Sequence, residues 1–216
     1  MNILTALLQL VVVLFAITIH EASHGWAAFK MGDPTAKSMG RITLNPIAHI
    51  DPIGTVALPL ILVLMGAPPF GWAKPVPVNP YNLRNPRRDN LLISAAGPIS
   101  NLTAALAAFI VLQLFQAAAP QAMYVTGGRP SLTNGLFLIL YYFVIINVIL
   151  AVFNMIPIPP LDGSGVLAGL LPPEAAQKYE QIRPYGFLIL MALIFTGIIG
   201  RVLGIIVGII NVFIFR

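Results

Sequence analysis

Apolar runs of membrane-crossing length dominate this chain and limit the folds open to it. A spanning helix needs about 20 apolar residues, because each adds about 1.5 Å across a hydrocarbon core about 30 Å thick. Of the 216 residues, 58% are hydrophobic and 9% are charged, whereas soluble domains carry about 25% charged residues. We therefore expect an all-α polytopic membrane protein with one domain over residues 1–216. Its clearest apolar runs are 3–29, 91–115, 135–156 and 186–215.

Two regions leave the predicted number of transmembrane helices at five to six. Run 54–69 is short and contains Pro59, so it is either a full span or a re-entrant hairpin. Run 186–215 is longer than one span requires and carries Arg201, which is costly at mid-bilayer without a partner. Two short helices turning at Gly200 and Arg201 are the favoured interpretation. The alternative is one tilted helix packed through a stripe of small residues, Gly200, Gly204 and Gly208.

Basic residues set the expected orientation. No Lys or Arg precedes Lys30, so the chain lacks the positive start of a signal peptide, and run 3–29 is expected to remain as a span. Basic residues follow this run and recur in loop 71–90, which places both loops in the cytosol. Loop 116–134 carries Arg129 alone and fits the outside. We expect a multi-pass protein of a prokaryotic plasma membrane, whose cationic loops explain the net charge of +5 without nucleic acid.

Loop 71–90 contains the proline-rich stretch AKPVPV at 73–78. Each proline disfavours helical backbone in the residue before it, so this stretch is expected to form a short β-like segment at the membrane. Exposed backbone over 73–80 would offer an edge to an extended substrate strand. An interfacial loop that only anchors the fold is the alternative.

The sequence HEASH at 20–24 places three ionisable side chains within the first apolar run. Residues four apart on a helix differ by about 40° in direction and about 6 Å along the axis, so His20 and His24 can bind one ion. Glu21 points about 100° away from His20, close enough to act on a water at that ion. Hydrogen-bonded core histidines are the weaker alternative, because the chain has only three histidines and three glutamates. His49 is interpreted as an ordinary loop histidine.

A catalytic zinc ion takes three protein ligands, and the absence of cysteine leaves Asp or Glu to supply the third. Asp162 is the strongest candidate, because it lies in NMIPIPPLDGSG directly after an apolar run. Prolines there interrupt the helix, and broken backbone at membrane depth is tolerated where it lines a wet cavity. A loop aspartate that caps the next helix is the alternative. The other acidic residues are Asp33, Asp51, Asp89, Glu174 and Glu180.

Together, HEASH in the first run and NMIPIPPLDG after a later one resemble the motifs of the site-2 protease family, the intramembrane zinc metalloproteases of peptidase family M50. The resemblance implies Zn²⁺ held by His20, His24 and Asp162, with Glu21 as the catalytic acid and base. Ser164 stands where many members have a second glycine, which leaves the ligand set intact. No PDZ-like or CBS-like domain fits in the remaining residues, so a minimal member is expected.

The same resemblance extends to substrate contacts. Asn154 matches a family asparagine that engages the substrate backbone, and AAGPISN (95–101) makes Asn101 a lesser substrate-binding candidate. The implied function is hydrolysis of peptide bonds within or near the transmembrane segments of membrane proteins. The alternative is an integral-membrane zinc-binding protein or transporter without protease activity, which leaves the position of Glu21 unexplained. The sequence does not indicate an oligomeric state.

Overall fold

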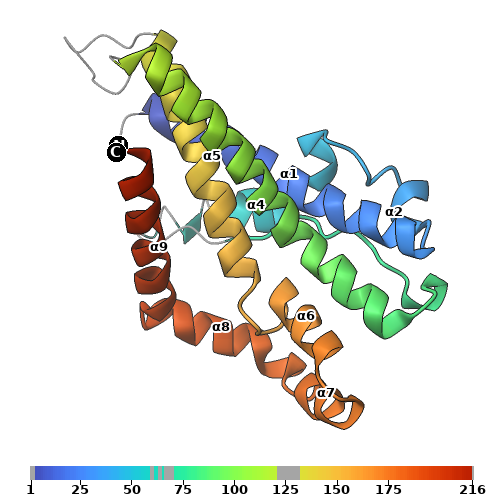
Figure 1. The fold of residues 1–216 in the computed structure, drawn as a ribbon. Coiled ribbons are helices and arrows are strands. Elements are labelled where there is room, and N and C mark those ends of the chain that lie inside the picture. The colour runs from blue at the N-terminus through green and yellow to red at the C-terminus, as the bar shows by residue number, and fades with distance from the viewer. Residues whose placement is uncertain (1–2, 59–60, 63–64, 66–70, 121–131, 216) are drawn as a thin grey trace.

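Three long apolar helices form the centre of the protein (Figure 1). They are α1 (Ile3–Met31), α4 (Pro86–Ala118) and α5 (Leu132–Asn154). The helices α4 and α5 lie side by side and antiparallel, and α1 packs against both. The structure is a computed structural model and describes residues 3–58, 61–62, 65, 71–120 and 132–215. The expected all-α fold is confirmed for this part of the chain.

Small side chains allow these helices to approach closely. In a bilayer, lipid tails are as apolar as Leu or Ile, so helices associate through close packing and interhelical hydrogen bonds. Alanines are buried on all three helices, on the faces that meet. They are Ala16 and Ala28 of α1, Ala105 and Ala108 of α4, and Ala151 of α5.

The predicted count of five to six spans is not confirmed. Within the described residues, three helices are long and apolar enough to cross a membrane, or four if one bent pair counts as a span. Run 54–69 contributes the π-helical turn Pro52–Ala57, and much of the remainder lies outside the described residues. Helix α8 (Gly186–Phe195) has 10 residues, which reach only about 15 Å, so it cannot cross alone.

The last apolar region contains two helices, as favoured, but the predicted position of the turn is wrong. Helix α8 is followed by α9 (Ile198–Ile214), and the helical segment Pro173–Phe195, which includes α8, differs in direction from α9 by 63°. The chain turns at Gly197, whose φ of 73° is left-handed and strains any residue with a Cβ. Gly200 and Arg201 lie inside the first turn of α9. A Cβ added at Gly200 would meet nothing within 4 Å, so this glycine forms no packing contact there.

The expected β-like segment is not confirmed, because residues 71–79 form neither helix nor strand in the structure. Pro75 and Pro77 have no N–H to donate. The neighbouring N–H groups are used elsewhere: Val76 donates to the Glu21 carboxylate and Asn79 to the Asp33 carboxylate. Together with isolated backbone bonds from Trp72 N to Gly54 O and from Lys74 N to His49 O, these side-chain contacts hold the segment without a ladder.

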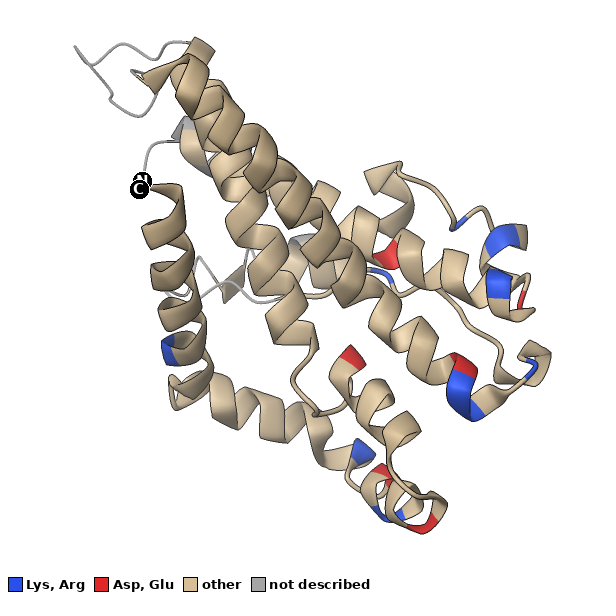
Figure 2. Ribbon diagram, viewed as in Figure 1, with Lys and Arg blue, Asp and Glu red and all other residues tan. Residues whose placement is uncertain are grey.

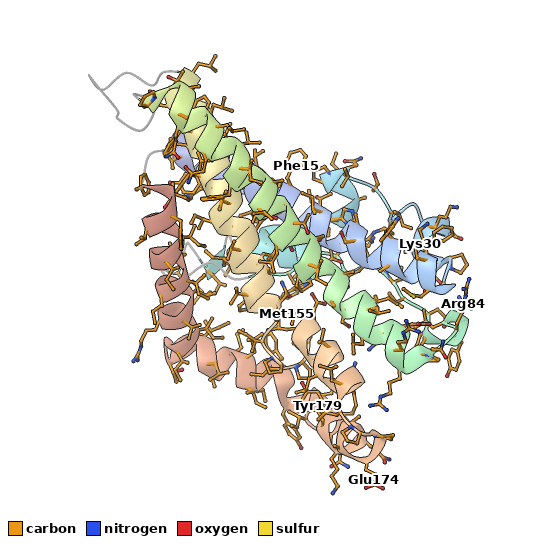
Figure 3. All side chains as sticks on the ribbon, in the orientation of Figure 1. Phe15, Lys30, Arg84, Met155, Glu174 and Tyr179 are labelled. Atoms are coloured by element: carbon orange, nitrogen blue, oxygen red, sulfur yellow. The ribbon has the colours of Figure 1, made fainter. Side chains whose placement is uncertain are left out.

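Most of the charged residues lie at one end of the helix bundle, and a further basic residue lies apart from them on α9 (Figure 2). Lys and Arg occupy the end of α1, the short helix α2 (Thr35–Ser38), the start of α4 and helix α7 (Pro173–Glu180). Figure 3 shows Lys30 and Arg84 at this same end. The distribution matches the loops predicted as cytosolic, whereas Arg129 of the predicted outer loop lies outside the described residues.

Candidate metal centre

Three potential metal ligands meet where α1 faces the start of α6 (Asp162–Leu170). His20 and His24 lie one turn apart on α1, and Asp162 is the first residue of α6. The Oδ2 atom of Asp162 is 2.9 Å from His20 Nε2 and 3.3 Å from His24 Nε2. The structure thus brings together three side chains that the sequence predicts to share a zinc ion. All three ligand atoms lie within 4.8 Å of one another.

An irregular connection returns the chain from the end of α5 to this position. Met155 lies at the lower end of α5, where the chain turns toward α6 (Figure 3). The prolines after it prevent a continuous helix, so α6 begins as a separate element beside α4. Gly163 sits against the carbonyl oxygens of Met155 and Ile156, where a Cβ would collide with both. This glycine therefore allows Asp162 to lie beneath the end of α5.

Both histidine rings are oriented through their Nδ1 atoms. His24 Nδ1 donates to the backbone oxygen of Ile93 at 2.7 Å, and His20 Nδ1 lies 2.5 Å from Asn101 Oδ1. A carbonyl oxygen only accepts, so each Nδ1 carries a proton, and in the neutral ring the Nε2 lone pair turns toward Asp162. A hydrogen bond from the second ring nitrogen is the usual way in which a metal-binding histidine is held.

The residues at this site fit a zinc ion. With both protons on Nδ1, two Nε2 lone pairs and a carboxylate oxygen face one another, and three acceptors repel unless a cation lies among them. Asp162 Oδ2 is buried, and no hydrogen-bond donor among the described residues satisfies it. The short contacts to the histidines therefore fit shared coordination of a cation by neutral rings. Two imidazole nitrogens and one carboxylate oxygen are a common ligand set of catalytic zinc.

Glu21 is held by a segment that the sequence did not connect with it. Its Oε2 accepts a hydrogen bond of 3.0 Å from the backbone N–H of Val76. That segment is fixed by Arg41, whose guanidinium donates to Lys74 O at 2.6 Å, and by Asp33, which accepts from Asn79 N at 2.7 Å. Both supporting side chains are buried. Nothing in the sequence indicates this arrangement, because the groups come from separate loops.

The two candidate asparagines lie in different environments. Asn154 ends α5, is partly exposed, and donates one amide N–H to Leu150 O. Asn101 is fully buried, and its amide contacts His20 and Ala16 O. Asn154 is thus partly accessible at the end of α5, whereas Asn101 faces the protein interior. His49 ends the short 3₁₀ helix Pro46–His49 and is buried there, unlike an ordinary loop histidine. Its Nε2 donates to Thr43 O at 3.0 Å, and it does not belong to the group of three ligands.

Gly97 is a site residue that the sequence did not single out. A Cβ built on it would lie 2.5 Å from His24 Nε2 and 2.6 Å from His20 Nε2. Only a residue without a side chain allows α4 to lie this close to the two rings. The sequence feature that could have indicated this role is the position of Gly97 before proline in AAGPISN, four residues before Asn101.

Comparison with known proteins identifies the class to which this site belongs. The model of peptidase family M50 matches residues 8–197. The chain belongs to this family, the site-2 protease family, and is a zinc metallopeptidase with apolar helices of membrane-crossing length.

Individual relatives agree with that assignment. YwhC of Bacillus subtilis (strain 168), classed by name as a zinc metalloprotease, is 38% identical over 186 residues, covering 86% of this chain and 79% of YwhC. Rip2 of Mycolicibacterium smegmatis, classed in the same way, is 28% identical over 189 residues, covering 87% of this chain and 66% of Rip2. Rip2 of Mycobacterium tuberculosis (strain H37Rv) is 24% identical over 184 residues, covering 83% of this chain and 63% of that Rip2. The search of solved structures found no match.

Proposed function

We propose that this metallopeptidase hydrolyses peptide bonds within or near the transmembrane segments of membrane-protein substrates. His20, His24 and Asp162 serve as zinc ligands and Glu21 as the general acid and base, within one intramembrane domain. The observation that carries the proposal is the position of the three ligands inside a bundle of membrane-crossing helices. A peptidase that acts only on soluble peptides has no need for its metal ligands at that position.

The depth of the site supports this choice of substrate. His24 lies seven residues before Met31, the end of α1, which corresponds to about 10 Å along the helix. The end of α1 carries the basic loops (Figure 2). We therefore place the active site below the membrane surface on the cytosolic side of a prokaryotic plasma membrane. Water reaches such a depth by a short path from that side.

Glu21 carries the proton in the proposed reaction. Bound zinc supplies a Lewis acid that lowers the pKa of water and polarises the scissile carbonyl. The Glu21 carboxylate accepts a proton from the attacking water and passes it to the departing amine. Because Val76 N–H binds Oε2, the orientation of the carboxylate is set before substrate arrives, and Oε1 is left for proton transfer.

The substrate must expose its backbone before attack. A transmembrane helix holds its carbonyl groups in hydrogen bonds, so the segment to be cut has to unwind locally. In this proposal Asn154 binds the released backbone, which is supported by the partial exposure of its amide at the end of α5. The 73–79 segment has fewer donors for a substrate strand than its sequence suggests, since the N–H groups of Lys74, Val76 and Asn79 are already used.

A transport function has less support from the site. Among the described residues, a single group of three side chains can hold a metal, whereas transport requires ligands along a path. Metal transport would also not require a glutamate such as Glu21 to be held in a fixed orientation beside the metal ligands.

A Glu21→Gln variant tests the proposed reaction. The amide keeps the size of the side chain but cannot take up the proton, so cleavage should fall by at least about 100-fold while zinc content stays unchanged. Glu174→Gln on the exposed face of α7 is the matched control and should behave as wild type. Comparing membrane-protein fragments in cells that express each form reads out the substrates. Cleavage by Glu21→Gln at the wild-type rate would exclude the role proposed for Glu21, and fragments confined to soluble proteins would exclude the membrane substrate.

A further inference from the structure

Asn147, in the middle of α5, is a buried polar residue that the proposed reaction does not use. Its side chain is fully buried, as is that of Asn101 on the neighbouring helix α4. A polar amide inside a membrane bundle is costly unless it is hydrogen-bonded. The two amides form such a bond: Asn101 Nδ2 donates to Asn147 Oδ1 at 2.7 Å.

Two backbone carbonyl oxygens, Phe143 O and Ala16 O, fix which end of each amide donates and which accepts. Phe143 O accepts from Asn147 Nδ2 at 2.8 Å, so the other end of that amide, the oxygen, faces Asn101. Asn101 must then present its NH₂ group, which also donates to Ala16 O at 3.1 Å. The oxygen of Asn101 is left facing His20 Nδ1 at 2.5 Å. Since carbonyl oxygens accept only, neither amide can flip without losing a bond.

We propose that Asn147 is a positioning residue for the metal centre and that it acts through Asn101 on His20. The chain of bonds keeps an acceptor at His20 Nδ1, which holds the proton there and leaves Nε2 free to bind the metal. The inference rests on the proposed role of His20 as a zinc ligand. It also gives Asn101 a role in orienting a ligand in place of the substrate contact expected from its motif.

The effect of breaking this chain is measurable on zinc binding itself. Partners that orient a metal-binding histidine typically contribute 10- to 100-fold to metal affinity. Asn147→Leu removes one of the two acceptors of the Asn101 NH₂ group and leaves only the longer bond to Ala16 O. Asn101 then turns its NH₂ group toward His20 at the loss of that single bond, which opposes the productive tautomer. Asn147→Ser keeps a hydroxyl that can bond to Phe143 O but is too short to reach Asn101.

The experiment measures zinc affinity of the purified full-length protein in detergent by competition with a chelator. Both Asn147 variants should bind zinc about 10- to 100-fold more weakly than wild type. Asn101→Leu should do the same, and adding Asn147→Leu to it should change nothing further, because the first change already breaks the chain. Nitrogen NMR with labelled histidine should show His20 losing its Nδ1–H form in the metal-free variants. Only three histidines contribute to that spectrum.

Two reference variants separate the possible explanations. Asn211→Leu removes the bond from Tyr141 Oη that joins α5 to α9 at 3.0 Å, away from His20, and should lower the unfolding temperature without changing zinc affinity. His20→Ala should abolish tight zinc binding, and if it does not, the proposed metal site itself is wrong. If His20→Ala loses zinc while both Asn147 variants keep wild-type affinity and the wild-type His20 signal, only the role of Asn147 is overturned. Additive losses in the double variant would likewise overturn action through Asn101.

Discussion

Replacing Gly97 by alanine is expected to damage the metal site although the change adds one methyl group. The new Cβ would lie 2.5 Å from His24 Nε2 and 2.6 Å from His20 Nε2. Ordinary contacts between such atoms are about 3.5 Å, so the overlap is about 1 Å. Metal–ligand distances vary by only about 0.2 Å in a working site. The helix or the rings must therefore move several times further than the site tolerates.

Either the histidine rings or helix α4 must move to remove this overlap, and each movement weakens zinc binding. If the rings turn away, the Nδ1 bonds to Ile93 O and Asn101 are lost, at a cost of about 10- to 100-fold in metal affinity. If α4 shifts from α1, the close packing of the bundle is lost, at about 1–3 kcal/mol. Zinc affinity should thus fall by at least about 10-fold, measured by chelator competition, and cleavage should fall with it.

Gly204→Ala is the matched control, because it is the same change within a helix. A Cβ at Gly204 would meet nothing within 4 Å, so helix propensity alone acts there and should stabilise α9 by up to about 1 kcal/mol. At Gly97 the gain from helix propensity is smaller, because Pro98 follows and disfavours a Cβ in the preceding helical residue. The overlap with the histidine rings predicts a loss. Wild-type zinc affinity together with an unchanged or higher unfolding temperature in Gly97→Ala would refute the reasoning.

Three further predictions concern the supports of the site. Val76→Pro removes the N–H that holds Glu21 and should slow cleavage by about 10-fold or more with zinc retained. Val78→Pro is its control, and an equal loss in both would favour a substrate edge over a role in holding Glu21. Burial raises the pKa of Asp33, but hydrogen bonds from Asn82, Thr35 and Asn79 outweigh this, and the pKa lies below its usual value. The stability that Asp33 contributes is thus complete above about pH 4 and lost as the pH falls through its folded pKa. The unfolding temperature of Asp33→Asn should therefore change less with acid pH than that of wild type. The same acid dependence in both proteins would contradict this. Removal of zinc by a chelator should lower the unfolding temperature. Zinc added back at about 100 times its Kd should restore about 2.7 kcal/mol of unfolding free energy. An unfolding temperature that does not respond to the chelator would argue against zinc at these ligands.

Several features could be read from the sequence because they depend on neighbours along the chain. Apolar run length predicts a membrane-crossing helix, since hydrocarbon thickness sets the number of residues required. The four-residue spacing of His20 and His24 places them on one helical face before any tertiary structure is known. The interrupted helix before Asp162 follows from its prolines. These local rules cover the ligand set, but they left the turn at Gly197 three residues away from its predicted position.

The tertiary structure alone decided how those ligands are held. Ile93 and Asn101 orient the two histidines from α4, Asn147 supports Asn101 from α5, and Val76 holds Glu21 from a loop. Hydrophobic periodicity shows that a helix has a buried face, but not which turn of one helix meets which turn of another. A hydrogen bond between helices depends on that register to within about an ångström. The sequence therefore determined which side chains are candidates for the proposed metal site, and only the packing of α1, α4 and α5 decided how they are oriented.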